Sequence, residues 1–438
     1  MLELISSGLL SLWLEEAGVD PAALRSPVPP PDAWGMVVPQ TDLDANVTIY
    51  AYLQSLEGQG VARGNQGIWL QANITALSSH QGLEPRRAAS ITKLATTLAV
   101  LDSLSPDWAI ETTVSVRGEV DEDGTLVGEL VVSGDRDPFF VYEEAIELGN
   151  ALERAGIQRI AGSIVVQGDV TLEGEDDADK VATMLRRTWS PKNWTPEIES
   201  AYTRMSKGTS RPSIPVRSPR RRSKSNRQGD PEPVVIHSSL SAIGLLKHMN
   251  VHSDNVLAQT LADRVGTPEG IAARVAQLAR VPATEVQLAD GSGLDRGNQI
   301  SPRAAAAILA AIQRHLWAYG LNLADVLPVF GTDGGTMDER NMPTGAAVKT
   351  GTLWDTSTLA GVFPTRDRGL VWFAIFNDGE DRTLKFREQQ DTLLRTLEQR
   401  WGKAETIPGA IAPQVSPDTS PDTRLGAPAR NRIIKTWP

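Results

Sequence analysis

The chain has 438 residues, of which 40% are hydrophobic and 22% are charged, and its formal net charge is −11. This length and composition are typical of a globular protein with two or three domains, and the acidic balance disfavours binding to nucleic acid or an anionic membrane through the whole surface. Because the sequence contains no cysteine, thiol catalysis, disulfides and thiolate metal sites are excluded.

Residues 1–40 are predicted to be an N-terminal helix and a linker outside the folded domains. Residues 4–14 are mostly apolar, but Glu3 precedes them and two glutamates follow them, so the charges favour an amphipathic helix over a signal peptide. Residues 20–40 contain six prolines and predict an extended linker. The sequence has no run of 18 apolar residues, so we expect no transmembrane segment.

Over residues 41–405 the periodicity of the hydrophobic residues predicts an α+β protein, in which a small β-rich domain interrupts a larger one. We place the larger, discontinuous domain at 41–111 and 232–405, and the inserted domain at 112–203. Helices are predicted near 89–104, 142–155, 239–250, 254–265, 268–280, 302–317 and 384–401. Strands are predicted near 67–74, 113–120, 126–132, 162–170, 346–352, 357–363 and 370–377.

Two further segments are predicted to be disordered. Residues 204–231 form a basic loop, because 204–227 contain nine Lys or Arg, no acidic residue and many Ser and Pro. A nucleic-acid patch is the alternative for this loop, but it lacks the aromatic residues that would stack on bases. The Pro- and Ser-rich tail, 406–438, is the second disordered segment.

The first chemical motif is Ser90-Ile91-Thr92-Lys93, the only Ser-x-x-Lys in the chain. Residues three apart share one face of a helix, so the serine hydroxyl and the lysine amine are expected within hydrogen-bond reach. Serine needs a neighbouring base to become a nucleophile, and a desolvated lysine with a neutral amine can be that base. The motif alone is a weak signal, because one such match is expected by chance in a chain of this length.

Two more motifs follow further along the chain. Ser253-Asp254-Asn255 lies between two predicted helices, where it is also an ordinary helix cap. Lys349-Thr350-Gly351-Thr352 lies on a predicted strand. Its glycine lets a substrate backbone approach the strand, while the lysine supplies a cation and the threonine hydroxyls can bind a carboxylate.

Ser-x-x-Lys, Ser-Asp-Asn and Lys-Thr-Gly in this order are the signature of penicillin-binding proteins and class A β-lactamases. The sequence from about 67 to 400 resembles the D-alanyl-D-alanine carboxypeptidase/endopeptidase family, the class C low-molecular-mass penicillin-binding proteins. Three other segments are similar to that family: 85–90 before the nucleophile, Ser133-Gly134-Asp135-Arg136-Asp137-Pro138, and Asp290-Gly291-Ser292-Gly293-Leu294.

The resemblance implies a penicillin-binding/β-lactamase-like transpeptidase domain, with an antiparallel sheet flanked by helices, an all-helical lobe and a small inserted β-rich domain. It implies a serine-type carboxypeptidase or endopeptidase that acts on peptidoglycan stem peptides, binds β-lactams and uses no cofactor or metal. The implied catalytic residues are Ser90, Lys93, Ser253 and Lys349, and the implied substrate-binding residues are Asn255, Thr350, Gly351 and Thr352. Such a substrate implies a periplasmic or other extracytoplasmic location, although the sequence shows no clear signal peptide.

Two other functions remain as alternatives, a β-lactamase and a non-catalytic penicillin-binding sensor. In class A β-lactamases the first two motifs lie close together and a Glu-x-x-Leu-Asn segment follows. Here 163 residues separate Ser90 from Ser253, and no Glu-x-x-Leu-Asn is present. His248 and His252 have a spacing that can bind a metal, but without an obvious third ligand we expect them to have a packing or surface role.

Overall fold

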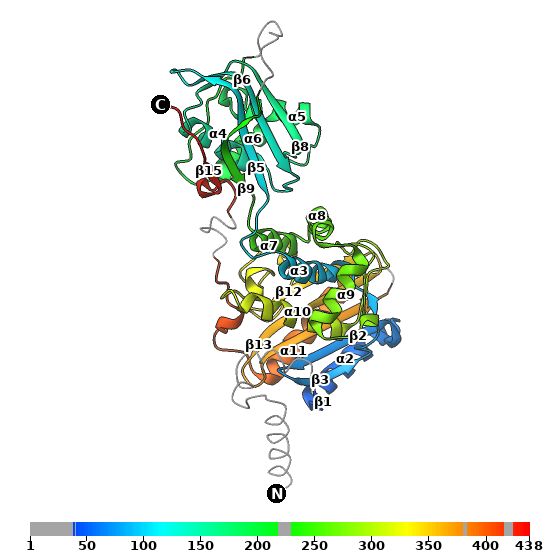
Figure 1. Cartoon of the computed structure of the whole chain (residues 1–438). Coiled ribbons are helices and arrows are strands. Elements are labelled where there is room, and N and C mark those ends of the chain that lie inside the picture. The colour runs from blue at the N-terminus through cyan, green and yellow to red at the C-terminus, as the bar shows by residue number, and fades with distance from the viewer. Residues whose placement is uncertain (1–37, 40, 218–228, 380–382, 416–423) are drawn as a thin grey trace. The chain divides into compact units, whose positions relative to one another are not determined.

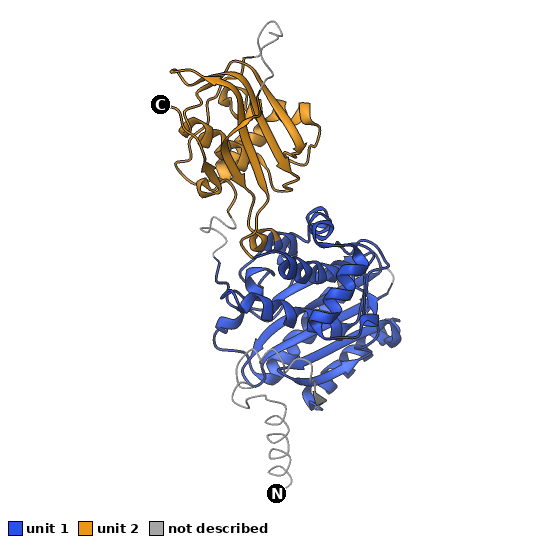
Figure 2. Ribbon diagram, viewed as in Figure 1, with its two compact units in different colours: residues 1–105, 246–415 blue, residues 106–245, 416–438 orange. Residues whose placement is uncertain are grey.

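The computed structural model describes residues 38–39, 41–217, 229–379, 383–415 and 424–438. The chain divides into two compact units (Figure 2), one containing residues up to 105 with 246–415, the other containing 106–245 with the residues from 416 onward. The predicted N-terminal helix and the centre of the basic loop lie outside the described residues.

Unit 1 is built on a six-stranded sheet with the strand order β1-β3-β2-β14-β13-β12 (Figure 1). The strands are β1 (Val38–Pro39), β2 (Gln66–Ala72), β3 (Thr75–His80), β12 (Ala347–Leu353), β13 (Thr356–Thr365) and β14 (Gly369–Asp378). Neighbouring strands are antiparallel, except that β1 lies parallel to β3. All ten residues of β13 are buried, which requires that both faces of the sheet be covered.

Helices cover both faces of this sheet. On one face α2 (Leu43–Gly58) and α11 (Thr383–Trp401) pack on the strands around a core that includes Leu53, Phe373 and Leu394. On the other face α10 (Pro302–Trp317) packs on β2 and β14, and α3 (Thr92–Ser103) packs on α10. The remaining helices are α7 (Ala242–His252), α8 (Asn255–Val265) and α9 (Pro268–Ala279). These layers make unit 1 an α+β structure, as the sequence predicts.

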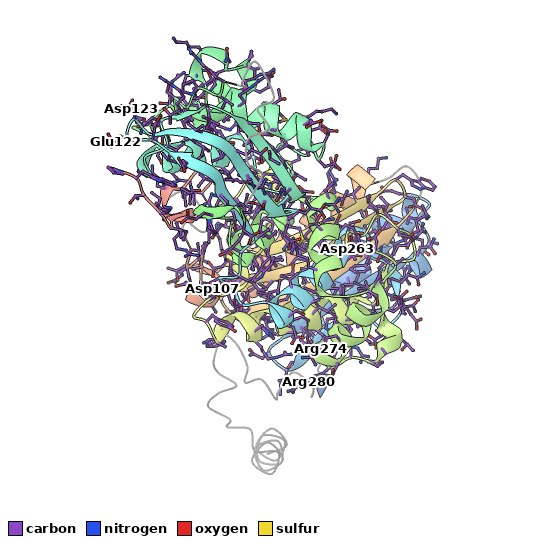
Figure 3. The ribbon with its side chains drawn as sticks, turned by 45° about the horizontal axis from the view of Figure 1, so that its top comes forward. Asp107, Glu122, Asp123, Asp263, Arg274 and Arg280 are labelled. Atoms are coloured by element: carbon purple, nitrogen blue, oxygen red, sulfur yellow. The ribbon has the colours of Figure 1, made fainter. Side chains whose placement is uncertain are left out.

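An ion pair joins α9 to the end of α3. Arg274 on α9 donates to both carboxylate oxygens of Asp102 at 2.7 and 2.8 Å. Figure 3 labels Arg274 together with Arg280, which ends α9 in the left-handed conformation. Because Lys93 lies in the first turn of α3, this pair helps to fix the helix that carries part of the first motif.

Unit 2 has its own sheet, in the order β15-β9-β5-β6-β7, with β8 paired to β6. Its strands are β5 (Glu111–Val120), β6 (Thr125–Asp135), β7 (Arg159–Ile160), β8 (Ser163–Asp169), β9 (Glu232–Ser238) and β15 (Asn431–Ile433). Its helices are α4 (Tyr142–Arg154), α5 (Ala178–Thr188) and α6 (Pro196–Arg204). A separate apolar core, which includes Leu130, Leu148 and Trp189, lies between the sheet and the helices.

The structure corrects the predicted bounds of the inserted domain, 112–203. Unit 2 extends from 106 to 245, so β9 belongs to it and not to the larger domain that we placed from 232. β9 pairs antiparallel with β5, from Glu111 opposite Ser238 to Val116 opposite Glu232, with a shift of register between Val114 and Ser115. Sequence analysis predicted no strand over 232–238, so nothing in the sequence assigned this segment to the sheet of the inserted domain.

The prediction of a disordered tail at 406–438 is wrong for the described residues. Residues 409–411 form a 3-10 turn in unit 1 with Ile411 buried, and residues 431–433 form β15 on the edge of β9. The described start of the basic loop is also packed: Ile214 is buried and its N–H donates to the Trp189 carbonyl at 2.8 Å. Composition predicted disorder here because it averages over a segment. It does not show that a single apolar or charged side chain packs against another part of the chain.

A buried charge cluster holds the end of the chain in unit 2. The guanidinium of Arg430 donates to Glu144 on α4, and the N–H of Gly426 donates to the same carboxylate at 2.9 Å. Burial raises the pKa of Glu144 to about 7, although Arg430 opposes that shift. Burial also lowers the pKa of His237 to about 3, so at neutral pH this imidazole is uncharged beside Glu144.

We predict that Arg430→Ala destabilises unit 2 by about 3 kcal/mol, because it leaves the carboxylate of Glu144 buried without its cation. Hydrogen exchange of peptides from β9 and β5 measures this loss in the folded chain. Arg432→Ala is the matched control, since Arg432 is exposed on β15, two residues after Arg430, and its loss is expected to cost less than about 0.5 kcal/mol. Equal protection in the two variants would contradict the prediction.

Candidate active site

The first motif forms a close pair, as its spacing predicts. Ser90 lies in a 3-10 turn, 89–91, immediately before α3, and Lys93 lies in the first turn of α3. The amine of Lys93 donates to the Ser90 hydroxyl at 3.1 Å, and the lysine side chain is fully buried. Ala89 has φ +47°, a conformation that is costly for a residue with a side chain and therefore needs support from its surroundings.

That support comes from the contacts of Ala88 and of the Ala89 carbonyl. The N–H of Ala88 donates to the Asn298 carbonyl at 3.0 Å, and the Thr358 hydroxyl donates to the Ala88 carbonyl at 2.9 Å. Gly293 lies so close that a side chain there would collide with the Ala89 carbonyl. The nucleophile is thus held by a strand of the sheet and by the loop that contains Gly293.

Lys93 has two further partners that the sequence does not reveal. Its amine donates to the Asn255 side-chain oxygen at 2.7 Å and to the Ser292 carbonyl at 2.6 Å. Asp290 shapes the loop around Ser292 by accepting from the N–H groups of Ser292 and Gly293 at 2.7 and 2.6 Å. The family-like segment 290–294 therefore acts as a support for the lysine.

Burial lowers the pKa of Lys93 to about 8, against the opposing effect of the carboxylates of Asp290 and Asp254. A neutral amine is therefore accessible near neutral pH. Such an amine accepts a proton through its lone pair, which is the property that a general base needs.

The three side chains of the second motif, Ser253-Asp254-Asn255, each contact a different partner. Ser253 has φ +54° and accepts a hydrogen bond from the Lys349 amine at 3.0 Å. Asp254 caps α8 by accepting from the N–H of Leu257 at 3.0 Å, which confirms the predicted cap. Asn255 reaches Lys93. The motif therefore brings the first and third motifs to the same place.

The third motif lies on β12, the last strand of the sheet order. Lys349 is fully buried, and burial together with the charge of Lys93 lowers its pKa. The amine of Lys349 donates to the Ser253 hydroxyl, so it is placed to exchange a proton with that group. Thr350 is 8% exposed.

Gly351 is where β12 approaches the nucleophile. A side-chain carbon there would lie 2.9 Å from the backbone nitrogen of Ser90, closer than such atoms approach one another. Thr352 follows with its side chain exposed, and its hydroxyl accepts from the Arg387 guanidinium at 2.9 Å. Sequence analysis missed Arg387 because it lies on α11, outside every motif.

His248 and His252 are neighbours, with ring centroids 4.3 Å apart, and burial lowers the pKa of His248 to about 4. Among the residues that the structure describes, no group of three or more His, Asp or Glu side chains is placed to hold a metal ion. In the same residues, no helix is both long and apolar enough to span a membrane.

The fold and the arrangement of the three motifs define a protein of the penicillin-binding/β-lactamase fold. The predatory endopeptidase Bd3459 of Bdellovibrio bacteriovorus superposes with a TM-score of 0.61 at 23% identity, over 78% of this chain and 94% of that one. Its penicillin G-acylated form, in complex with an immunity protein, gives 0.60 at 22% identity, over the same shares. Penicillin-binding protein 4 (dacB) of Haemophilus influenzae gives 0.54 at 17% identity, over 80% and 99%.

Sequence comparison identifies the family itself. The model of the D-Ala-D-Ala carboxypeptidase 3 (S13) family matches residues 52–183 and 221–399, and the chain belongs to this family. A curated relative, carboxypeptidase DacB of Mycolicibacterium smegmatis, is 29% identical over 163 residues. That match spans 33% of this chain and 35% of the relative, about a third of its length.

We predict that Gly351→Ala lowers the rate of acylation by a β-lactam by about a hundredfold, because the new methyl group pushes β12 away from Ser90. A fluorescent penicillin measures this rate. Gly409→Ala is the control, since a side-chain carbon there meets no atom within 4 Å. The prediction fails if both variants are acylated at the rate of the unchanged protein.

The pH dependence of acylation should follow Lys93. Because the base is the neutral amine, the rate should rise with pH and level off above a midpoint near 8. Asp254→Asn keeps a good helix cap but removes a carboxylate that raises the pKa of Lys93, so it should move the midpoint to lower pH. An acylation rate that stays constant from about pH 6 to about pH 10, on both sides of the midpoint, would rule out Lys93 as the base.

Proposed function

We propose that this protein is a serine-type D-Ala-D-Ala carboxypeptidase or endopeptidase, which cleaves peptidoglycan stem peptides through an acyl-enzyme on Ser90 and is acylated by β-lactams. One observation carries the proposal: the Ser90 hydroxyl lies 3.1 Å from the amine of a buried lysine with a lowered pKa. The membership in the S13 family supports the same activity.

In the first step Lys93 removes the hydroxyl proton of Ser90, and the oxygen attacks the carbonyl of the penultimate D-alanine. A tetrahedral oxyanion then forms, and we assign its stabilisation to the backbone N–H groups of Ser90 and Thr352. The approach of Gly351 to the Ser90 nitrogen supports this assignment, because it brings the two segments together. One such donor contributes about 3 kcal/mol in serine peptidases that have been tested by mutation.

In the second step the leaving amine needs a proton. The Lys349 amine donates to Ser253 at 3.0 Å, so a proton can pass from Lys349 through the Ser253 hydroxyl to the departing D-alanine. Burial supports this route, since it lowers the pKa of Lys349 and weakens its hold on the proton. Asn255 would bind the side-chain amide of the substrate, while Thr350 and Thr352 would bind its terminal carboxylate.

Water, or the amine of a second peptide, then releases the acyl group. The sequence has no Glu-x-x-Leu-Asn segment to supply a dedicated base for deacylation. We therefore expect the acyl-enzyme formed with penicillin to persist, which separates this function from that of a β-lactamase. Because its substrate is cell-wall peptide, we also propose that the protein works in the periplasm or another extracytoplasmic space.

Intact-protein mass after incubation with benzylpenicillin tests the proposal. We predict one penicilloyl adduct per chain, and none in Ser90→Ala, because the Ser90 hydroxyl lies beside the amine of Lys93, the proposed base. Ser103→Ala is the matched control at the exposed far end of α3, and it should be acylated in full.

The other outcomes discriminate the alternatives. Penicillin that is consumed without a lasting adduct would identify a β-lactamase. No adduct and no consumption would show that the site does not react with β-lactams, and the proposal would fail. Release of D-alanine from a pentapeptide, compared with cleavage of a cross-linked dimer, then distinguishes carboxypeptidase from endopeptidase activity.

A further inference from the structure

Arg387 is a charged residue at the substrate strand that no motif contains. It lies on α11, and its Nη2 donates to the Thr352 hydroxyl oxygen at 2.9 Å. Its other ionic neighbour, the Glu339 carboxylate, lies 3.9 Å away on a side chain that is 82% exposed. An exposed pair at that distance contributes little to stability, so it does not account for the place of Arg387.

The backbone around Arg387 is held firmly. One turn further along α11, Gln390 donates to the Ser357 carbonyl at 3.1 Å and to the Asn377 side chain at 2.8 Å. The next residue, Asp391, accepts from the buried Arg340 at 2.6 Å. These contacts fix α11 on β13 and β14, so Arg387 is placed against the end of β12 by a rigid element.

The contact with Arg387 determines what the Thr352 hydroxyl can do. A hydroxyl has one proton to donate and accepts through its oxygen, while a guanidinium can only donate. The Arg387 bond therefore occupies the oxygen of Thr352 as an acceptor and leaves its proton for another partner. A group that accepts this proton and also gains from an adjacent positive charge is an anion, and a carboxylate fits the planar guanidinium well.

We propose that Arg387 is a specificity-determining residue, which with Thr352 selects substrates that have a free carboxylate on the leaving side of the scissile bond. This inference rests on the proposed function. It adds a residue and a cause: the preference for a free terminal carboxylate arises from a cation on α11, and not from the Lys-Thr-Gly-Thr strand alone.

The test compares the acid and the amide form of one substrate peptide. We would measure kcat/KM for a peptide that ends in D-Ala-D-Ala and for the same peptide that ends in D-alaninamide. In Arg387→Gln the acid should lose about ten- to a hundredfold while the amide changes little, because only the acid has a charge to pair with the guanidinium. Benzylpenicillin and its methyl ester give the same comparison for acylation.

Two variants control the result. Arg387→Lys keeps the charge and should retain part of the acid preference, which a role in folding alone would not explain. Arg395→Gln removes the same charge from α11, where Arg395 donates to the backbone carbonyl of Asp391 and to the Thr392 hydroxyl, and it should leave the ratio unchanged.

An unchanged ratio in Arg387→Gln, or an equal loss for acid and amide, would overturn the inference. Both results presuppose that the unchanged protein forms a Ser90-dependent adduct with benzylpenicillin. If that adduct is absent, the proposed function fails, whereas an adduct with an unchanged acid-to-amide ratio removes only the role of Arg387.

Discussion

The burial of the Lys93 amine is the interaction on which the rest of the site depends. A lysine that has lost its water needs hydrogen-bond partners, and it obtains them from Ser90 at 3.1 Å, Asn255 at 2.7 Å and the Ser292 carbonyl at 2.6 Å. These partners belong to three separate segments of the chain. Desolvation therefore has two effects: it lowers the pKa of the amine, so that the neutral form that accepts a proton is accessible near neutral pH, and it holds the three segments together.

The backbone around the site stores strain for the same purpose. Ala89 and Ser253 both have positive φ, and neither is a glycine. Each lies where the chain turns into a helix. Ala89 directly precedes Ser90, which contacts Lys93, and Ser253 itself contacts Lys349. The surrounding hydrogen bonds offset this cost, which is of order 1–3 kcal/mol per residue. The two serines are thus positioned before any substrate arrives.

The sequence predicted most helices and strands of unit 1, although not α2 or β3, and it predicted the contact of Ser90 with Lys93, because these depend on local spacing. The helix predicted at 302–317 is α10, and Ser90 and Lys93 meet because residues three apart share a helix face. Contacts between distant segments were not predictable. Nothing local shows that Arg387 reaches Thr352 across 35 residues, that β9 joins the sheet of unit 2, or that Arg430 pairs with Glu144.

The pairing of β15 with β9 has a consequence for the order of folding. His237 and Asn431 contact each other across 194 residues, and most of that span, 246–415, belongs to unit 1. The edge strand of unit 2 is therefore added only after all of unit 1 has been synthesised, because the second part of unit 1 lies between β9 and β15 in the sequence. Closing so long a loop is slow. Until then the edge of β9 offers unpaired backbone groups, which exposes the nascent unit 2 to mispairing.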